Sequence, residues 1–244
     1  MKTPSRGWPL LQHTGWSALV AGVCAGLLLT LAQQAWVVPH ITEAERFETL
    51  RHETGTQGTS NKAHTPIPPS GGGEDPPESA HSWRRTGMRA VGNGILGVGF
   101  GLLLVSAMTL RIRHGDSQGI PAGLLWGMAG WTAFSLAPAL GLPPQLPGVP
   151  QASVGLRQGW WIATAVTTAF GLAVLAFAPT RFKAVGAALL LAPHILEAPS
   201  PPLSSIVLPP DLPARFTAAV LATTALFWAT QGAIAGWMNQ RLGP

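Results

Sequence analysis

The chain has 244 residues, of which 47% are hydrophobic and only 10% are charged, with a formal net charge of +5. In an average soluble domain roughly a quarter of the residues are charged, so this composition excludes an ordinary soluble protein. The hydrophobic residues form blocks of about 20, long enough to cross the ~30 Å hydrocarbon core of a bilayer. The sequence predicts an all-α, polytopic transmembrane helical bundle that forms one integral membrane domain over residues 1–244, with the lipid bilayer and no nucleic acid as partner.

Six blocks predict six membrane spans, at about 16–38, 88–110, 122–142, 160–178, 182–196 and 214–237. The first follows Lys2 and Arg6, but its apolar run is longer than a signal-peptide core and no A-x-A cleavage site follows, so we expect a retained helix. It contains Cys24, the only cysteine, so no intrachain disulfide can form. The fifth block is short, barely long enough to cross without tilt or local thinning of the bilayer.

Residues 39–87, between the first two blocks, are polar. The stretch PHITEAERFETLRHE predicts a short helical continuation to about His52. The Gly-, Ser-, Thr- and Pro-rich sequence that follows cannot bury enough apolar surface to order itself. We therefore expect a long, disordered first outer loop over residues 54–82.

Pairs of glycines four residues apart recur in four of the predicted spans: Gly22/Gly26, Gly97/Gly101, Gly123/Gly127 and Gly232/Gly236. Small residues at this spacing let helix backbones approach closely in lipid, although some such pairs arise by chance in a chain with 29 glycines. The stretch GNGILG, which begins at Gly92, matches the dinucleotide fingerprint only in its letters, because no βαβ unit surrounds it. We expect close helix packing at these glycines.

Residues 136–161, LAPALGLPPQLPGVPQASVGLRQGWW, separate the third and fourth spans. Five prolines make a continuous helix implausible, because each removes a backbone donor and clashes with the preceding turn: Pro138, Pro143, Pro144, Pro147 and Pro150. The segment ends with Arg157, Trp160 and Trp161, and tryptophan favours the headgroup level of a membrane. The pattern favours a fixed corner at the membrane surface; an ordinary connecting loop is the alternative.

The distribution of Lys and Arg predicts that both termini lie in the cytoplasm. With six spans, the short inner segments hold seven basic residues and the two short outer loops hold two: Lys2, Arg6, Arg111, Arg113, Arg181, Lys183 and Arg241 against Arg157 and Arg215. This is the positive-inside bias. The long outer loop also carries Arg84, Arg85 and Arg89, but long loops are translocated largely regardless of charge. We expect a multi-pass protein of a bacterial-type inner membrane.

No predicted span carries a charged residue near its centre, where one would cost about 2.5–3.5 kcal/mol. The polar residues inside the spans are Gln33, Gln34, Asn93, Ser135, Thr164, Thr167, Thr168, Thr223, Thr224 and Gln231. They form no acid–base or nucleophile constellation, and the chain has no P-loop motif. We expect that the protein is not an enzyme and binds no permanent cofactor.

Two hexapeptides, PHITEA at residues 39–44 and PHILEA at residues 193–198, agree in five positions. Each places a histidine three residues before a glutamate, so His40 with Glu43, and His194 with Glu197, share a helix face. Nitrogen and oxygen together suit a divalent ion such as Co²⁺, Ni²⁺ or Zn²⁺. These four residues are the candidate metal ligands, and they form one site only if the first and fifth spans are neighbours. Alternatively, they merely mark where lipid ends.

Several segments resemble the CbtA family of predicted cobalt transporter subunits. They are W-G-x-A-G-x-x-A-F at residues 126–134, LAPALGLPPQLPG, RQGWW, LLAPHI, WVVPxI followed by EAExxE, and the ALFW and GWM stretches near the C-terminus. The resemblance covers most of the chain outside the 54–82 loop. It implies a membrane protein that takes up cobalt for cobalamin synthesis, often with a small single-span companion, CbtB, that bears histidines.

The resemblance also bears on individual residues. His194 matches a family histidine, and Glu43, Glu45 and Glu48 match an acidic run. It further implies a histidine where this chain has Ser135, and a histidine-rich first outer loop, where this chain has only His52, His64 and His81.

The leading hypothesis is a membrane subunit for uptake of Co²⁺ (or Ni²⁺) as the transported ion. The alternative is a non-transporting scaffold or accessory subunit of a metal transporter.

Overall fold

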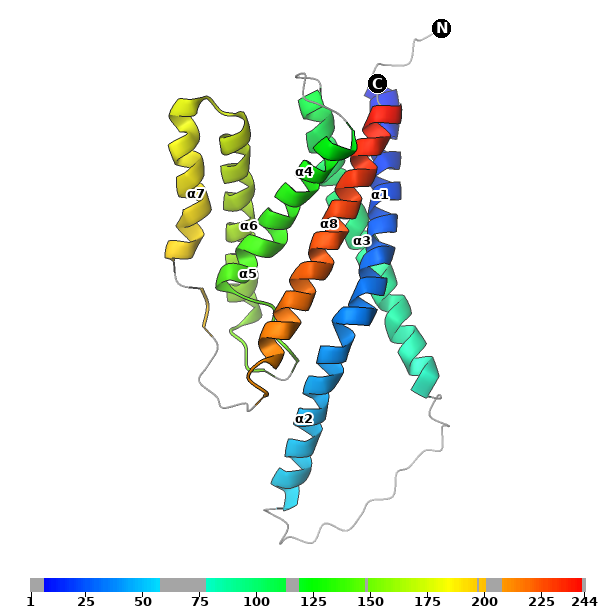
Figure 1. Cartoon of the computed structure of the whole chain (residues 1–244), viewed down its shortest axis with the longest axis vertical. Coiled ribbons are helices and arrows are strands. Elements are labelled where there is room, and N and C mark those ends of the chain that lie inside the picture. Colours follow the sequence, from blue (N-terminus) through cyan, green and yellow to red (C-terminus); the bar gives the residue numbers. More distant parts are fainter. Residues whose placement is uncertain are drawn as a thin grey trace.

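The computed structural model describes residues 7–57, 78–112, 119–147, 149–196, 198–200 and 208–242, and every regular element within these ranges is helical. The helices are α1 (Gly7–Trp36), α2 (Val38–Gln57), α3 (Glu78–Ile112), α4 (Ile120–Trp131), α5 (Ala137–Gly141), α6 (Val154–Phe177), α7 (Lys183–Ile195) and α8 (Leu212–Leu242). A π-helical turn, η1 (Thr132–Leu136), joins α4 to α5, and a 3₁₀ turn, η2 (Thr180–Phe182), precedes α7. The all-α bundle predicted from composition is confirmed (Figure 1).

Five helical stretches in the described chain are long and apolar enough to cross a membrane: Gln12–Trp36, Trp83–Arg111, Ile120–Gly141, Val154–Phe177 and Leu212–Arg241. They correspond to five of the six predicted spans. The remaining one is α7, which has 13 residues. At 1.5 Å per residue it is about 20 Å long, short of the ~30 Å hydrocarbon core. Helix length therefore supports five spans, and the sixth stays a prediction.

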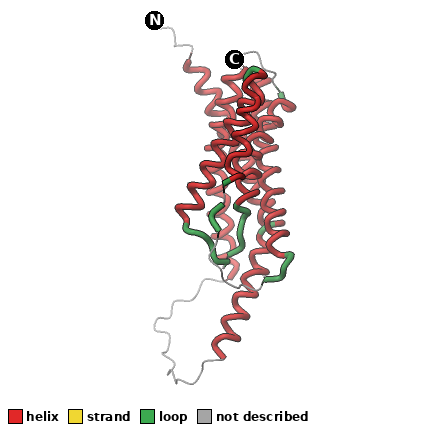
Figure 2. The backbone as a smooth tube through the Cα atoms, turned by 90° about the vertical axis from the view of Figure 1, so that its left-hand side faces the viewer, coloured by secondary structure: helices red, strands yellow, loops and turns green. Residues whose placement is uncertain are grey.

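The direction of the chain bears on the number of crossings. The start of α1 and the end of α8 lie at the same end of the bundle, drawn uppermost in Figures 1 and 2, as an even number of crossings requires. α6 ends at this upper end, whereas α8 begins near the lower end. The chain between Phe177 and Leu212 must therefore return from the upper to the lower end, and α7 covers part of that path.

The polar region after α1 is more helical than expected. Backbone hydrogen bonds continue through Val37, from Val37 N to Gln33 O (2.9 Å) and from Ile41 N to Val37 O (3.3 Å). Pro39 lies in the first turn of α2, where its missing N–H is not needed. α2 reaches Gln57 and α3 begins at Glu78, so the expectation of disorder over 54–82 is wrong at both ends. Residues 58–77 lie outside the described part of the chain.

Glycines bring two helix pairs into backbone contact, as the glycine spacing predicts. α1 and α3 cross where Gly22 meets Gly97 and where Gly26 meets Asn93, so that a Cβ on Gly26 would lie 2.6 Å from Asn93 O. α4 and α8 cross in the same way, and a Cβ on Gly236 would lie 2.9 Å from Gly123 Cα. A side chain at either of these positions would force the two backbones apart. The predicted close packing is confirmed.

The helices form a central group and an attached hairpin. α1, α3, α4 and α8 pack on one another, and buried side chains from α1, α3 and α8, among them Ala18, Val105 and Ala235, fill the space between them. α6 and α7 pack together at the side (Figure 1). Ring contacts tie this hairpin to the centre: Phe177 of α6 stacks on Trp126 at 5.8 Å and lies 4.0 Å below the Arg111 guanidinium.

Candidate functional site

The candidate metal ligands lie at the surface of the helices. His40 is half-buried on α2 and Glu43, three residues later, is exposed. His194 is exposed near the end of α7, directly after the buried Pro193. Glu197 lies outside the described residues. Whether these side chains bind a metal stays a prediction.

The two histidine pairs lie on helices that do not adjoin. α7 packs against α6, whereas α2 packs against α1 and α8, and Figure 1 shows α7 at the upper left and α2 at the lower end of the molecule. The neighbour relation on which a four-ligand site depended is therefore not met within one chain. Among the described residues, no group of three or more His, Cys, Asp or Glu side chains could hold a metal ion.

A polar network joins α1 and α3 toward the lower end of the bundle. Asn93 Nδ2 donates to Thr30 Oγ1 (3.0 Å) and to Gln33 Oε1 (2.9 Å). One turn away, Arg89 Nη1 donates to Gln34 Oε1 (3.0 Å). The network gives the intramembrane amides hydrogen-bond partners from a neighbouring helix, as buried polar groups in lipid require.

The other polar side chains differ in their hydrogen bonding, and the buried hydroxyls of Thr164 and Thr168 have no partner among the described residues. Thr167, Thr223 and Thr224 donate to carbonyls of their own preceding turn, which is the common role of threonine in a membrane helix. Gln231 instead is fully buried at the centre of the bundle, and its Nε2 donates to Gly97 O at 2.6 Å. Its Oε1 has no partner in the described part of the chain, so a neutral oxygen is left available at this depth.

The proline-rich corner differs in detail from the expectation. The helix continues through Pro138 and ends at Gly141, and residues 142–147 and 149–153 are not helical. A continuous helix is thus excluded as predicted, but the break falls after Pro138. Trp160 packs on Gly141, where a Cβ would collide with its ring, and its Nε1 is buried. Trp160 therefore joins α5 to α6, and its place at the headgroup level stays a prediction.

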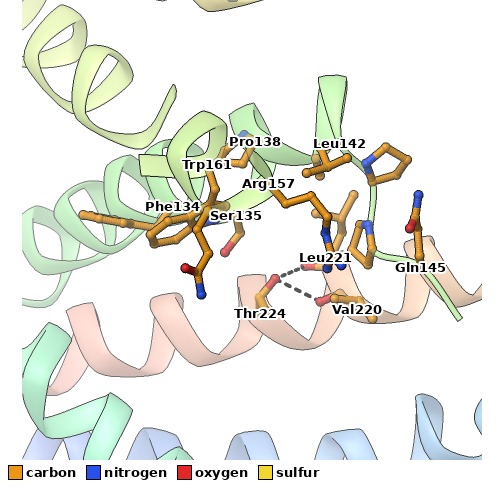
Figure 3. A pocket seen from close by; sticks show the side chains of 14 residues that line it. Phe134, Ser135, Pro138, Leu142, Gln145, Arg157, Trp161, Val220, Leu221 and Thr224 are labelled. Atoms are coloured by element: carbon orange, nitrogen blue, oxygen red, sulfur yellow. Dashed lines mark hydrogen bonds between the residues drawn. The ribbon is translucent and has the colours of Figure 1, made fainter. Parts of the chain in front are cut away.

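A cavity of about 390 Å³ lies where this corner meets α6 and α8. Its walls come from η1, α5, residues 142–145, the first turns of α6 and the first half of α8 (Figure 3). The polar lining residues are Ser135, Gln145, Arg157, Gln158 and Thr224, and aromatic rings of Phe134 and Trp161 form part of the wall. This cavity was not predictable from the sequence, because it depends on how α8 packs beside a corner about 70 residues earlier.

The charge of the cavity is distinctive. Among the described residues that line it, Arg157 is the only charged one, and no carboxylate is present. Figure 3 shows the Arg157 side chain reaching toward Leu221 of α8. Ser135, where the family resemblance implies a histidine, also lines the cavity. In this chain the cavity therefore offers hydroxyl, amide and guanidinium groups and none of the ligands that a transition-metal ion prefers.

The apolar helix lengths, the glycine crossings and the polar network within the bundle define a polytopic helical membrane protein. The model of one protein family, described as "Probable cobalt transporter subunit (CbtA)", matches residues 14–240. The chain therefore belongs to the CbtA family, which confirms the resemblance noted in its sequence. No curated protein and no solved structure matches the chain.

The match includes nearly the whole chain, so it covers the described helices apart from the first turns of α1 and the last residues of α8. The family description names cobalt as the metal that is transported. It is the description of a transport component rather than an enzyme.

Proposed function

We propose that the protein takes up Co²⁺, or Ni²⁺, across a bacterial-type inner membrane and so supplies metal for cobalamin synthesis. The observation that carries this proposal is the family match over residues 14–240 of a bundle with five apolar helices long enough to span a membrane. Both termini face the cytoplasm in this proposal, because the short segments at the upper end hold most of the basic residues.

Capture takes place at the lower end, which is then the outer one. The pair His40 and Glu43 on α2 and the pair formed by His194 on α7 with Glu197 each offer one nitrogen and one oxygen ligand. Because the two pairs lie apart, each needs further ligands from water, a second copy of the chain or a CbtB-like single-span partner. A negative interior favours entry by about 2.3 kcal/mol per charge per 100 mV, which is doubled for a divalent ion.

The second candidate is a non-transporting scaffold that stabilises a partner and contacts metal only at its surface. It is favoured by one observation: no group of three or more metal-binding side chains occurs among the described residues. The two candidates differ in whether the chain alone moves metal.

The experiment measures radiolabelled Co²⁺ uptake into vesicles that contain only this chain, with an inside-negative potential. Uptake is expected, and His194→Ala should lower it at least about tenfold at limiting cobalt, a factor that corresponds to roughly 1.4 kcal/mol. His40→Ala should lower it less.

His64→Ala, which removes a histidine outside both pairs, is the matched control and should leave uptake unchanged. Vesicles with no uptake would favour the scaffold. Uptake that is normal in His194→Ala would show that this histidine is not a ligand.

A further inference from the structure

We propose that the cavity at the proline-rich corner binds a phosphate ester that carries a hydrogen-bond donor, such as the head group of phosphatidylglycerol. This site is separate from the metal-binding pairs and does not depend on the proposed transport.

The electrostatics of the cavity select an anion. Arg157 is half-buried in the wall, and no acidic side chain lines the described cavity to neutralise it. Arg157 Nη1 donates to Gln151 Oε1, which uses one of the five N–H donors of the guanidinium. The remaining donors form a planar fork that matches the oxygens of a phosphate group.

A second group in the lining favours a head group that carries a hydroxyl over one that has no donor. Gln145 Oε1 is buried in the lining and has no hydrogen-bond partner among the described residues. A buried acceptor without a partner is costly, and the phosphodiester of a lipid has no O–H of its own to donate to this oxygen. A glycerol hydroxyl linked to the phosphate would supply a donor to this oxygen.

The surroundings of the cavity suit the remainder of a lipid. Leu140, Val154 and Leu156, on the two helices that flank the corner, expose 70%, 63% and 64% of their surface. Trp161 also contributes an apolar face, 38% exposed, beside the cavity. Exposed apolar side chains near an end of the bundle are where acyl chains meet a membrane protein, so a head group in the cavity leaves its chains in contact with them.

The test compares Arg157→Gln with Arg215→Gln. Arg215 lies at the start of α8 near the same end of the bundle, pairs with Asp211 at 2.6 Å and does not line the cavity. Both variants remove one positive charge, so a general loss of surface potential affects them alike. The purified proteins are mixed with phosphatidylglycerol, phosphatidylcholine or soluble glycerol 3-phosphate, and the bound ligand is counted by native mass spectrometry.

We expect the wild type and Arg215→Gln to retain phosphatidylglycerol over phosphatidylcholine, and Arg157→Gln to retain about tenfold less. Binding of glycerol 3-phosphate that depends on Arg157, without retention of the lipid, would identify a soluble source for the same group. Equal retention in Arg157→Gln and Arg215→Gln for both anions would overturn the proposal. Arg157→Lys keeps the charge but loses the planar fork of donors, so it should bind phosphatidylglycerol at an intermediate level. This variant replaces Arg157→Gln in the test if Arg157→Gln does not insert into the membrane.

Discussion

Gly101 offers a sharp test of the backbone contact between α1 and α3. A Cβ at Gly101 would lie 2.7 Å from Ala18 O and 3.0 Å from Gln231 Nε2. The first distance is about 0.7 Å short of the 3.4 Å at which ordinary contact begins. Because the first atom met is backbone, it cannot rotate away, and α1 has to retreat along the crossing.

The expected cost follows from this displacement. A gap of 0.5–1 Å forfeits roughly a quarter to a half of each contact's attraction, and overpacked sites lose about 1–3 kcal/mol. Gly101→Ala should therefore lower the free energy of unfolding by about 1–3 kcal/mol and weaken the bond from Gln231 to Gly97. Gly99→Ala is the control. Gly99 lies on the same helix as Gly101, but a Cβ at this position would have no atom within 4 Å.

Equilibrium unfolding of the purified protein in mixed micelles measures both variants. Gly99→Ala should be neutral or more stable by up to about 1 kcal/mol, since alanine reduces the backbone freedom of the unfolded chain. Equal stability of the two variants would refute the conclusion that the glycine at 101 is required for helix approach.

Two further predictions concern topology and the long loop. Reporter fusions after Met1 and after Pro244 should report the same, cytoplasmic compartment, and opposite compartments would contradict six crossings. Replacing residues 58–77 with a Gly/Ser linker of equal length should leave cobalt uptake unchanged, because their composition resembles that of a solvated linker; loss of uptake in a protein that still inserts would make this loop a metal collector.

The sequence predicted the parts of the fold that depend on local properties. Apolar length alone located the helices, and the four-residue spacing of Gly22 and Gly26 located a crossing, because both signals act within one helix. It did not predict that α2 would extend to Gln57. A polar helix contains no apolar block from which its length can be predicted, and the helix propensity of its residues is a weak guide to where it ends.

The candidate sites show the same division. The His–Glu spacing is visible in each hexapeptide, but whether His40 and His194 meet depends on the order of helices in the bundle, which the spacing does not encode. The cavity is harder to predict from the sequence, because Gln145 and Thr224 come together only when α8 packs on the proline-rich corner. The π-helical turn at Thr132–Leu136 has no sequence signature, although turns of this kind are frequent at functional sites.

We infer that the two candidate histidines lie at different depths, and this predicts the order in which a metal ion meets them. His40 lies in the first turn of α2, and its neighbours Val37 and Ala44 pack on Leu212 and Phe216 at the start of α8. Figure 1 shows α7 ending well above the start of α8. α7 begins near the upper end and is only about 20 Å long, so we infer that its end, at His194, lies deeper in the ~30 Å hydrocarbon layer than His40 does.

An ion that enters from the lower end therefore reaches His40 and Glu43 before His194. Loss of an outer ligand weakens capture, so His40→Ala should raise the cobalt concentration for half-maximal uptake and leave the maximal rate nearly unchanged. Loss of a deeper ligand slows a later step, so His194→Ala should lower the maximal rate at saturating cobalt. Concentration series of Co²⁺ uptake separate these parameters, and a lowered maximal rate in His40→Ala with an unchanged one in His194→Ala would reverse the order inferred from the helix lengths.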